Sequence, residues 1–202
     1  QWLITGSTEK FTRLWFEVNV NKFIVKAFDG NEVQRKKGKW VPYNKGGDYR
    51  KWYGNNDFVV NWENNGYEIK NFKDEKGKLR SRPQGSDFYF LSVITWTKIS
   101  SSKISFRYKE RGGISSEAGM TICVSDKLRE YILGFLNSSI GQYILNALSP
   151  TLNYELGDIA KLPVIINEIK LGEISDKVQL CEKISQNEWD SFETSWDFQR
   201  HP

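Results

Sequence analysis

Residues 35–56 (RKKGKWVPYNKGGDYRKWYGNN) combine a high density of cations with aromatic rings. The stretch holds seven Lys and Arg against one acidic residue, Asp48, with two Trp and three Tyr among them. A disordered basic tail lacks such aromatics, and a buried core strand lacks such charge. Cations attract phosphate, and the Gly46-Gly47 pair lets backbone approach a partner closely. The pattern is typical of a surface that grips a polyanion such as nucleic acid; a solvated hairpin with a few buried aromatics is the alternative.

Charge is unevenly divided along the chain. Residues 1–150 carry 24 Lys and Arg against 15 Asp and Glu, whereas residues 151–202 carry five against ten. This asymmetry predicts a basic working domain over residues 1–166, followed by an acidic helical tail over residues 167–202 that leads to the rest of a parent chain. The start at Gln1 rather than Met also suggests a piece of something longer.

Composition places the chain among globular proteins, because 39% of its 202 residues are hydrophobic and 14% are aromatic. No apolar run approaches the roughly 20 residues that span a bilayer, so no membrane partner is expected. Cys123 and Cys181 lie far apart in apolar surroundings, which favours buried, reduced thiols and a cytoplasmic location.

Hydrophobic periodicity predicts an α+β fold, in which a twisted, mostly antiparallel sheet from residues 20–124 carries a two-part helix packed on it and a C-terminal helical segment. Helices are predicted at residues 8–18 after an N-cap at Ser7, on both sides of a break at residues 137–139, and at residues 174–184. Strands are predicted at residues 23–28, 57–62, 67–69 (after a turn at 64–66), 88–99, 103–108, 120–124 and 162–166.

Several kinds of catalytic site are absent from the sequence. The chain has one His, no Cys-x-x-Cys, no phosphate-binding loop, no G-x-G-x-x-G and no Pro-Pro pair. Asp57 followed by Glu68-Ile69-Lys70 has the order of a metal-dependent nuclease motif, although a charged hairpin strand explains the same spacing. We therefore expect no catalytic, cofactor or metal residues in this chain.

Several segments resemble the target recognition domains of large adenine-specific DNA methyltransferases. Residues 6–18 (GSTEKFTRLWFEV) are similar to an opening motif that usually reads Thr-Gly-Asp-Asn and then Phe-x-Arg-x-Trp-x-Glu-Val, with Ser7-Thr8 in place of Asp-Asn. Residues 39–62 and 80–90 resemble the same family, and residues 106–122 resemble its Arg-containing hairpin. Residues 132–164 are similar to its Leu-Asn-Ser helix and closing strand, and residues 189–198 resemble the segment that follows in the PglX-type enzymes of BREX phage defence.

The resemblance implies a TaqI-like C-terminal specificity domain that recognises a short sequence in double-stranded DNA. It implies that this domain presents an adenine to a catalytic domain of the same parent chain, where S-adenosylmethionine is bound, and that other defence-system subunits are possible partners. A protein-interaction module that binds an acidic partner is the rival hypothesis.

Candidate DNA contacts fall into three groups by chemistry. Lysines position a protein on phosphates, an Arg guanidinium can grip guanine in bidentate fashion, and tyrosines pack on sugars or stack on bases. Four Trp residues (Trp40, Trp52, Trp62 and Trp96) are expected mainly in the core. The candidate DNA contacts are Lys36, Lys37, Lys39, Lys45 and Lys51 for phosphates, Arg50, Arg80, Arg82 and Arg107 for bases, and Tyr43 and Tyr49 for sugars or bases.

Overall fold

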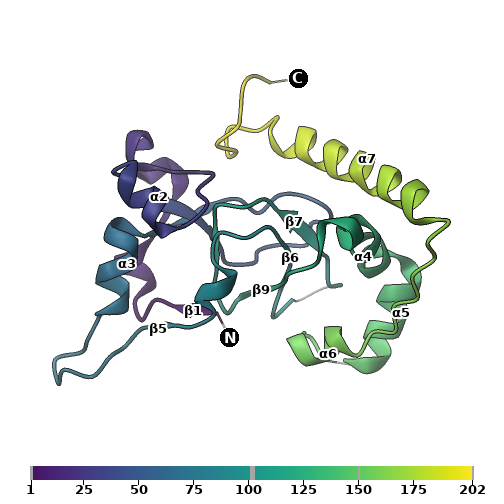
Figure 1. The fold of residues 1–202 in the computed structure, drawn as a ribbon, viewed down its shortest axis with the longest axis horizontal. Helices are drawn as coiled ribbons and strands as arrows, with labels where there is room; N and C mark the ends of the chain where they lie inside the picture. Colours follow the sequence, from purple (N-terminus) through teal and green to yellow (C-terminus); the bar gives the residue numbers. More distant parts are fainter. Residues whose placement is uncertain (1, 101–102, 150, 202) are drawn as a thin grey trace. The chain divides into compact units, whose positions relative to one another are not determined.

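The structure, a computed structural model, describes residues 2–100, 103–149 and 151–201. Its mixed helices and strands confirm the predicted α+β class (Figure 1). The chain folds into two compact units: the first comprises residues 1–45, 56–92 and 110–117, and the second comprises residues 46–55, 93–109 and 118–202. Each unit joins segments that are distant in sequence.

A four-stranded sheet organises the first unit. Its strand order is β2-β4-β3-β8, and its pairs are antiparallel except for the parallel pair β3–β8. A second ladder pairs β1 with β5 in antiparallel register. The strands are β1 (Leu3–Ile4), β2 (Thr12–Leu14), β3 (Trp40–Asn44), β4 (Phe58–Asn61), β5 (Arg82–Pro83) and β8 (Ile114–Ser115).

Short helices connect these strands and bury their apolar sides against them. The N-caps of the first two α-helices are Ser7 and Asp29, whose side chains accept hydrogen bonds from Lys10 N and Glu32 N. The core of this unit consists of fully or nearly buried residues that include Phe11, Val41 and Trp62. The helices are α1 (Thr8–Phe11), α2 (Gly30–Arg35) and α3 (Glu63–Lys70), with the 3-10 helices η1 (Trp15–Glu17), η2 (Val20–Lys22) and η3 (Ser86–Phe88).

Three predictions for this unit were wrong. The helix expected at residues 8–18 ends at Phe11, because Thr12–Leu14 pair with β4 as an edge strand. The strand expected at 23–28 is reduced to one bridge, between Phe23 and Trp40. The strand expected at 67–69 is helical instead, although the turn before it forms as predicted, with residues 64–66 in left-handed conformation.

A three-stranded antiparallel sheet organises the second unit. Its order is β7-β6-β9, and the central strand pairs Thr95 with Arg107 on one side and with Thr121 on the other. Trp96 is fully buried and donates from Nε1 to the carbonyl of Tyr154 at 2.9 Å. The strands are β6 (Val93–Thr97), β7 (Arg107–Lys109) and β9 (Gly119–Ile122).

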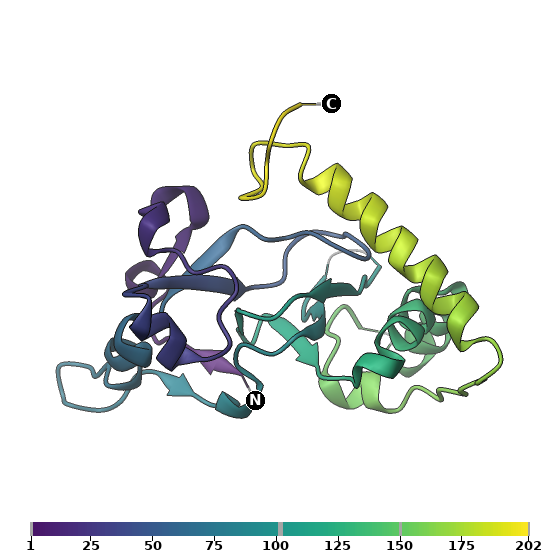
Figure 2. The ribbon, with the colours of Figure 1, turned by 45° about the horizontal axis from the view of Figure 1, so that its top comes forward.

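The predicted two-part helix forms in the second unit. It breaks between Asn137 and Ser139, where Ser138 caps the following helix by accepting from Gly141 N at 3.0 Å. The long C-terminal helix α7 lies alongside α4 in both views (Figures 1 and 2). The helices are η4 (Asp126–Leu128), α4 (Arg129–Asn137), α5 (Ser139–Leu148), α6 (Leu156–Ala160) and α7 (Leu171–Trp189).

Two predictions for this unit were also wrong. Residues 162–166 form no strand, and the short helix α6 precedes them. Cys123 is exposed rather than buried, although it and Cys181 are free thiols as expected. Among the described residues, no helix is long and apolar enough to cross a membrane.

Candidate nucleic-acid interface

The basic stretch is shared between the two units. Residues 35–45 and 56 belong to the first unit, and residues 46–55, which we call the basic loop, belong to the second.

Three lysines of the first unit lie at or near its surface around α2 and β3. Lys36 Nζ lies 2.7 Å from Glu32 Oε1, and this bond is the main reason that the pKa of the Glu32 carboxyl is lowered. Lys39 Nζ lies 3.0 Å from Glu63 Oε2, and Lys37 is exposed. Surface ion pairs of this kind contribute little stability, so a phosphate would compete readily with the two glutamates for Lys36 and Lys39.

Lys45 and two arginines complete the cations of this unit. Burial lowers the pKa of Lys45, whose Nζ lies 4.7 Å from the centre of the Phe58 ring. Arg80 is exposed with its guanidinium 5.6 Å from the centre of the Phe72 ring. Arg82 is exposed on the short strand β5, and no ion pair to it is found among the residues that the structure describes. Both arginines are thus accessible, as base readout requires.

Tyr43 lies in the core of the first unit. Its side chain is only 6% exposed, and its hydroxyl donates to the carbonyl of Leu3 at 3.4 Å. Burial raises the pKa of this phenol. Because it does not reach the surface, we leave Tyr43 out of the proposed contacts.

Arg107 lies in the core of the second unit with a fully buried side chain. Nη1 donates to the carbonyl of Arg50 at 3.1 Å and to Ser105 Oγ at 3.3 Å, and Nη2 donates to Thr97 Oγ1 at 3.3 Å. Burial, with a smaller contribution from the charge of Arg50, lowers its pKa to about 10. Arg107 therefore binds the backbone of the basic loop from within the core and does not face a base. We leave it out of the proposed contacts.

The basic loop is fastened to the strand β7 through its backbone. Trp52 N donates to the carbonyl of Phe106, and Tyr108 N donates to the carbonyl of Trp52, both at 2.9 Å. Trp52 has a φ of 72°, which is unusual for a bulky residue and costs on the order of 1 kcal/mol. The two hydrogen bonds hold Trp52 in this conformation. They also join the basic loop, which is expected to contact DNA, to the Arg-containing hairpin.

A lysine fixes the far end of the basic loop. Lys109 Nζ donates to the carbonyls of Gly54 and Asn55, each at 2.8 Å. The side chain of Asn55 in turn donates to the carbonyl of Asp48 at 2.9 Å. These bonds close the loop on itself and leave Gly47, Asp48 and Tyr49 exposed at its tip.

The two cations that follow the tip contact helices of the same unit. Lys51 Nζ donates to the carbonyl of Asn137 at 2.9 Å. Arg50 makes a two-point ion pair with Glu188 at the end of α7 and lies with its guanidinium 4.9 Å from the centre of the Trp189 ring. Both cations are thus positioned, and Arg50 keeps 26% of its side chain exposed.

Asn137 holds the backbone next to β7, a role that its predicted place at a helix break did not indicate. Its Nδ2 donates to the carbonyl of Phe106 at 2.9 Å, and its Oδ1 accepts from Phe106 N at 3.1 Å. The amide side chain thus replaces a strand partner beside β7. The Leu-Asn-Ser sequence was the available signal, because a buried Asn at the end of a helix pairs with backbone.

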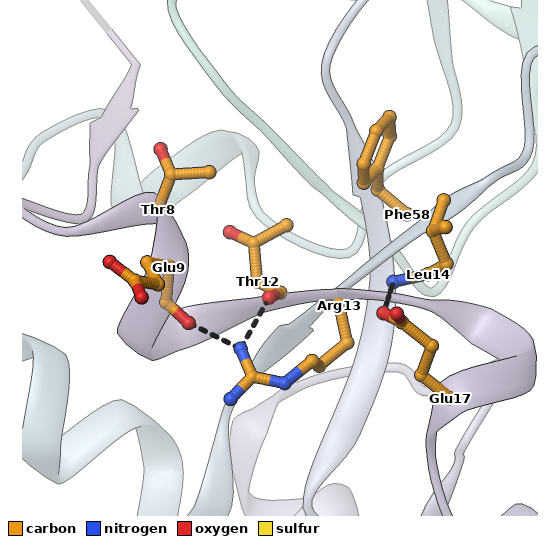
Figure 3. A pocket seen from close by; sticks show the side chains of 7 residues that line it. All are labelled: Thr8, Glu9, Thr12, Arg13, Leu14, Glu17 and Phe58. Carbon is orange, nitrogen blue, oxygen red and sulfur yellow. Dashed lines mark hydrogen bonds between the residues drawn. The ribbon is translucent and has the colours of Figure 1, made fainter.

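The opening motif also has a structural role. Figure 3 shows Arg13 Nη1 directed at the carbonyls of Glu9, which lies in the helix α1, and of Thr12, which directly follows it. Glu17 Oε2 accepts from Leu14 N at 2.8 Å. These contacts shape an open pocket of about 340 Å³ lined by Thr8, Glu9, Thr12, Arg13, Leu14, Glu17 and Phe58.

Two residues of the nuclease-like motif, Glu68 and Lys70, contact other side chains of the first unit. Glu68 accepts from Asn61 Nδ2 at 2.8 Å, and Lys70 Nζ lies 5.2 Å from the centre of the Trp62 ring. Within the described ranges, no group of three or more His, Cys, Asp or Glu residues is placed to hold a metal ion.

No protein-family model matches the chain. Two curated proteins, however, match 97% of it: the adenine-specific methyltransferase BrxX of Escherichia coli O9:H4 (strain HS), at 35% identity, and the adenine-specific methyltransferase PglX of Lacticaseibacillus casei (strain Zhang), at 36%. The chain is similar to part of each of these proteins. It spans only 15% and 16% of their lengths.

Proposed function

We propose that this chain is the DNA-recognition domain of an adenine-specific DNA methyltransferase of a phage-defence system. Its similarity to segments of two proteins that are named adenine-specific methyltransferases supports this assignment. In the proposal, a catalytic domain elsewhere in the parent protein binds S-adenosylmethionine and transfers the methyl group. This chain selects the site in double-stranded DNA at which the transfer occurs.

The anchored basic loop is the observation that carries the proposal. Arg107 binds the carbonyl of Arg50 in the middle of the loop and Lys109 fixes its far end, while Tyr49 is exposed at the tip beside Arg50. A loop that is already ordered loses less entropy on binding and places its side chains reproducibly. That combination suits sequence readout better than a flexible basic tail would.

The contacts divide into positioning and reading residues. Lys36, Lys37 and Lys39 are proposed to contact phosphates, together with Lys45 and Lys51, because a flexible ammonium supplies attraction without base discrimination. The exposed Arg80 and Arg82 are proposed to read base edges, where one bidentate pair contributes about 1–3 kcal/mol of discrimination. Tyr49 is proposed to pack on a sugar or base next to Arg50.

Binding to a pool of random-sequence duplex DNA at two salt concentrations tests this function, with sequencing of the bound fraction. We expect an enriched motif of a few base pairs and an affinity that falls steeply with salt, since each phosphate contact adds about −0.9 to the log–log slope. Steep salt dependence without a motif would contradict sequence readout by this chain. No binding at either salt would reject the DNA function and favour a surface for a protein partner.

A further inference from the structure

The C-terminal end of α7 brings an acidic segment to the basic loop. Residues 186–198 (NEWDSFETSWDF preceded by Gln186) contain four carboxylates, no Lys, Arg or His, and four aromatic residues. Beyond the helix the segment stays folded, since Ser195 Oγ donates to Asp190 Oδ1 at 2.6 Å. The segment thus alternates negatively charged groups with aromatic rings. In this it is similar to DNA, which the basic loop is proposed to bind.

Three contacts join this end of the helix to the loop. Glu188 pairs with both terminal nitrogens of Arg50, and the Trp189 ring stacks against the same guanidinium. One turn earlier, Ser185 Oγ donates to the carbonyl of Lys51 at 3.0 Å. A carboxylate that grips a guanidinium at two points takes the place that a phosphate or guanine edge would take.

Gly54 makes the close approach possible. It has a φ of 117°, and a Cβ at this position would lie 2.9 Å from a ring carbon of Trp189. The basic loop therefore has a glycine at the point where the Trp189 ring packs against it. The contact thus depends on residues of both the loop and α7.

We propose that Glu188 is a built-in competitor of DNA: its carboxylate occupies Arg50 in the DNA-free protein and is displaced by a DNA phosphate or base edge on binding. The inference rests on the proposed DNA function and adds its regulation. Glu188 is half exposed and its pair with Arg50 lies at the surface, so the exchange has a low cost. Weakly matched polyanions fail to displace it, which raises the selectivity of the loop.

The test compares the full chain with Glu188→Gln and with a matched control, Glu173→Gln. Glu173 lies on the same helix and pairs with Lys170 and Lys177, so its substitution changes the net charge equally without touching Arg50. Binding to random duplex DNA is measured over a salt series. For Glu188→Gln we expect about fivefold tighter binding with a log–log salt slope close to that of the parent chain, because Arg50 contacts DNA in both complexes. Glu173→Gln should stay within about twofold of the parent chain.

Each other outcome is informative. Equal gains for both variants would reduce the effect to general charge and overturn the inference. Weaker binding by Glu188→Gln would show that Glu188 positions Arg50 for DNA, which also overturns it. Unchanged binding by Glu188→Gln, with the parent chain still enriching a motif, would overturn the inference and leave the DNA function standing. If neither the parent chain nor Glu188→Gln binds DNA, both proposals fail.

Discussion

Burial separates the two tyrosines that the sequence placed in the same functional group. Tyr49 is 49% exposed at the tip of the basic loop, whereas Tyr43 is 6% exposed and bonds inside the first unit. The same side chain therefore has two expected roles, one in binding and one in stability. Each role leads to a separate measurement.

Tyr49→Ala is expected to weaken DNA binding by about 1 kcal/mol, roughly fivefold, because a stacked or packed ring is lost. The free energy of unfolding should hardly change, since the ring is exposed. Fluorescence anisotropy with the selected duplex measures the first effect, and urea unfolding measures the second. Tyr67→Ala is the matched control, because Tyr67 is also exposed but lies on α3. Equal effects of the two substitutions would contradict a role for the loop tip.

Tyr43→Phe is expected to change how stability depends on alkaline pH. Burial raises the pKa of Tyr43 and of Tyr89 above the ordinary value of 10.0. Above pH 10 the unfolded chain loses phenolic protons that the folded chain retains, so the free energy of unfolding falls as pH rises. Each tyrosine contributes up to about 1.4 kcal/mol per pH unit to that fall.

Urea unfolding at a series of pH values from neutral to above pH 10 measures the effect. The Phe variant should lose stability less steeply than the parent chain above pH 10 and show no such difference near neutral pH. Tyr67→Phe removes the hydroxyl of an exposed tyrosine and is the control for the substitution itself. A Phe variant with the slope of the parent chain would show that Tyr43 does not keep its proton through burial.

At the scale of elements, the basic loop depends on side chains of β7 for its shape. Lys109 donates to two of its carbonyls, and Arg107 donates to a third. An ammonium bonded to two carbonyls contributes on the order of 1–3 kcal/mol, so its removal should loosen the loop locally.

Lys109→Met is therefore expected to speed amide hydrogen exchange within residues 46–56 while the central strand β6 stays protected. DNA affinity should fall because the loop must then be ordered on binding. Lys183→Met removes the same charge from the exposed face of α7 and is the control for electrostatics. If both variants exchanged and bound alike, anchoring by Lys109 would play no part in recognition.

Elements fixed by neighbouring residues could be predicted from the sequence. The cap at Ser7, the helix break at residues 137–139, the strand at Phe58–Asn61 and the helix containing Ile174 and Ile184 all follow from local hydrogen bonding and periodicity. Failures occurred where distant partners decide. Thr12–Leu14 join a sheet because β4 is available later in the chain, where Val60 lies opposite Thr12 at a separation of 48 residues.

The candidate site follows the same rule. Exposure of Tyr49, Arg80 and Arg82 agrees with their predicted roles, which remain predictions. The burial of Arg107 was not predictable, because its acceptors Arg50 and Thr97 lie 57 and 10 residues away. Glu188 was missed as well, since a single Glu in an acidic segment gives no sequence signal of the Arg it meets.

At the scale of the whole molecule, the distribution of charge and the anchoring of the basic loop both favour the proposed DNA binding. The cations gather in residues 1–150, the acidic segment contacts one of them, and the relatives that the chain resembles are named adenine-specific methyltransferases. Centrally, we propose that the basic loop contacts duplex DNA in a fixed conformation.

Amide hydrogen exchange of the full chain, with and without its selected duplex DNA, tests this claim most directly. No backbone hydrogen bond donated by Asp48 or Tyr49 is found within the described residues, so these amides should exchange fast in the free protein. We expect DNA to slow exchange at the tip of the basic loop and around Arg80 and Arg82. Bound DNA that leaves exchange in residues 46–55 unchanged would contradict it.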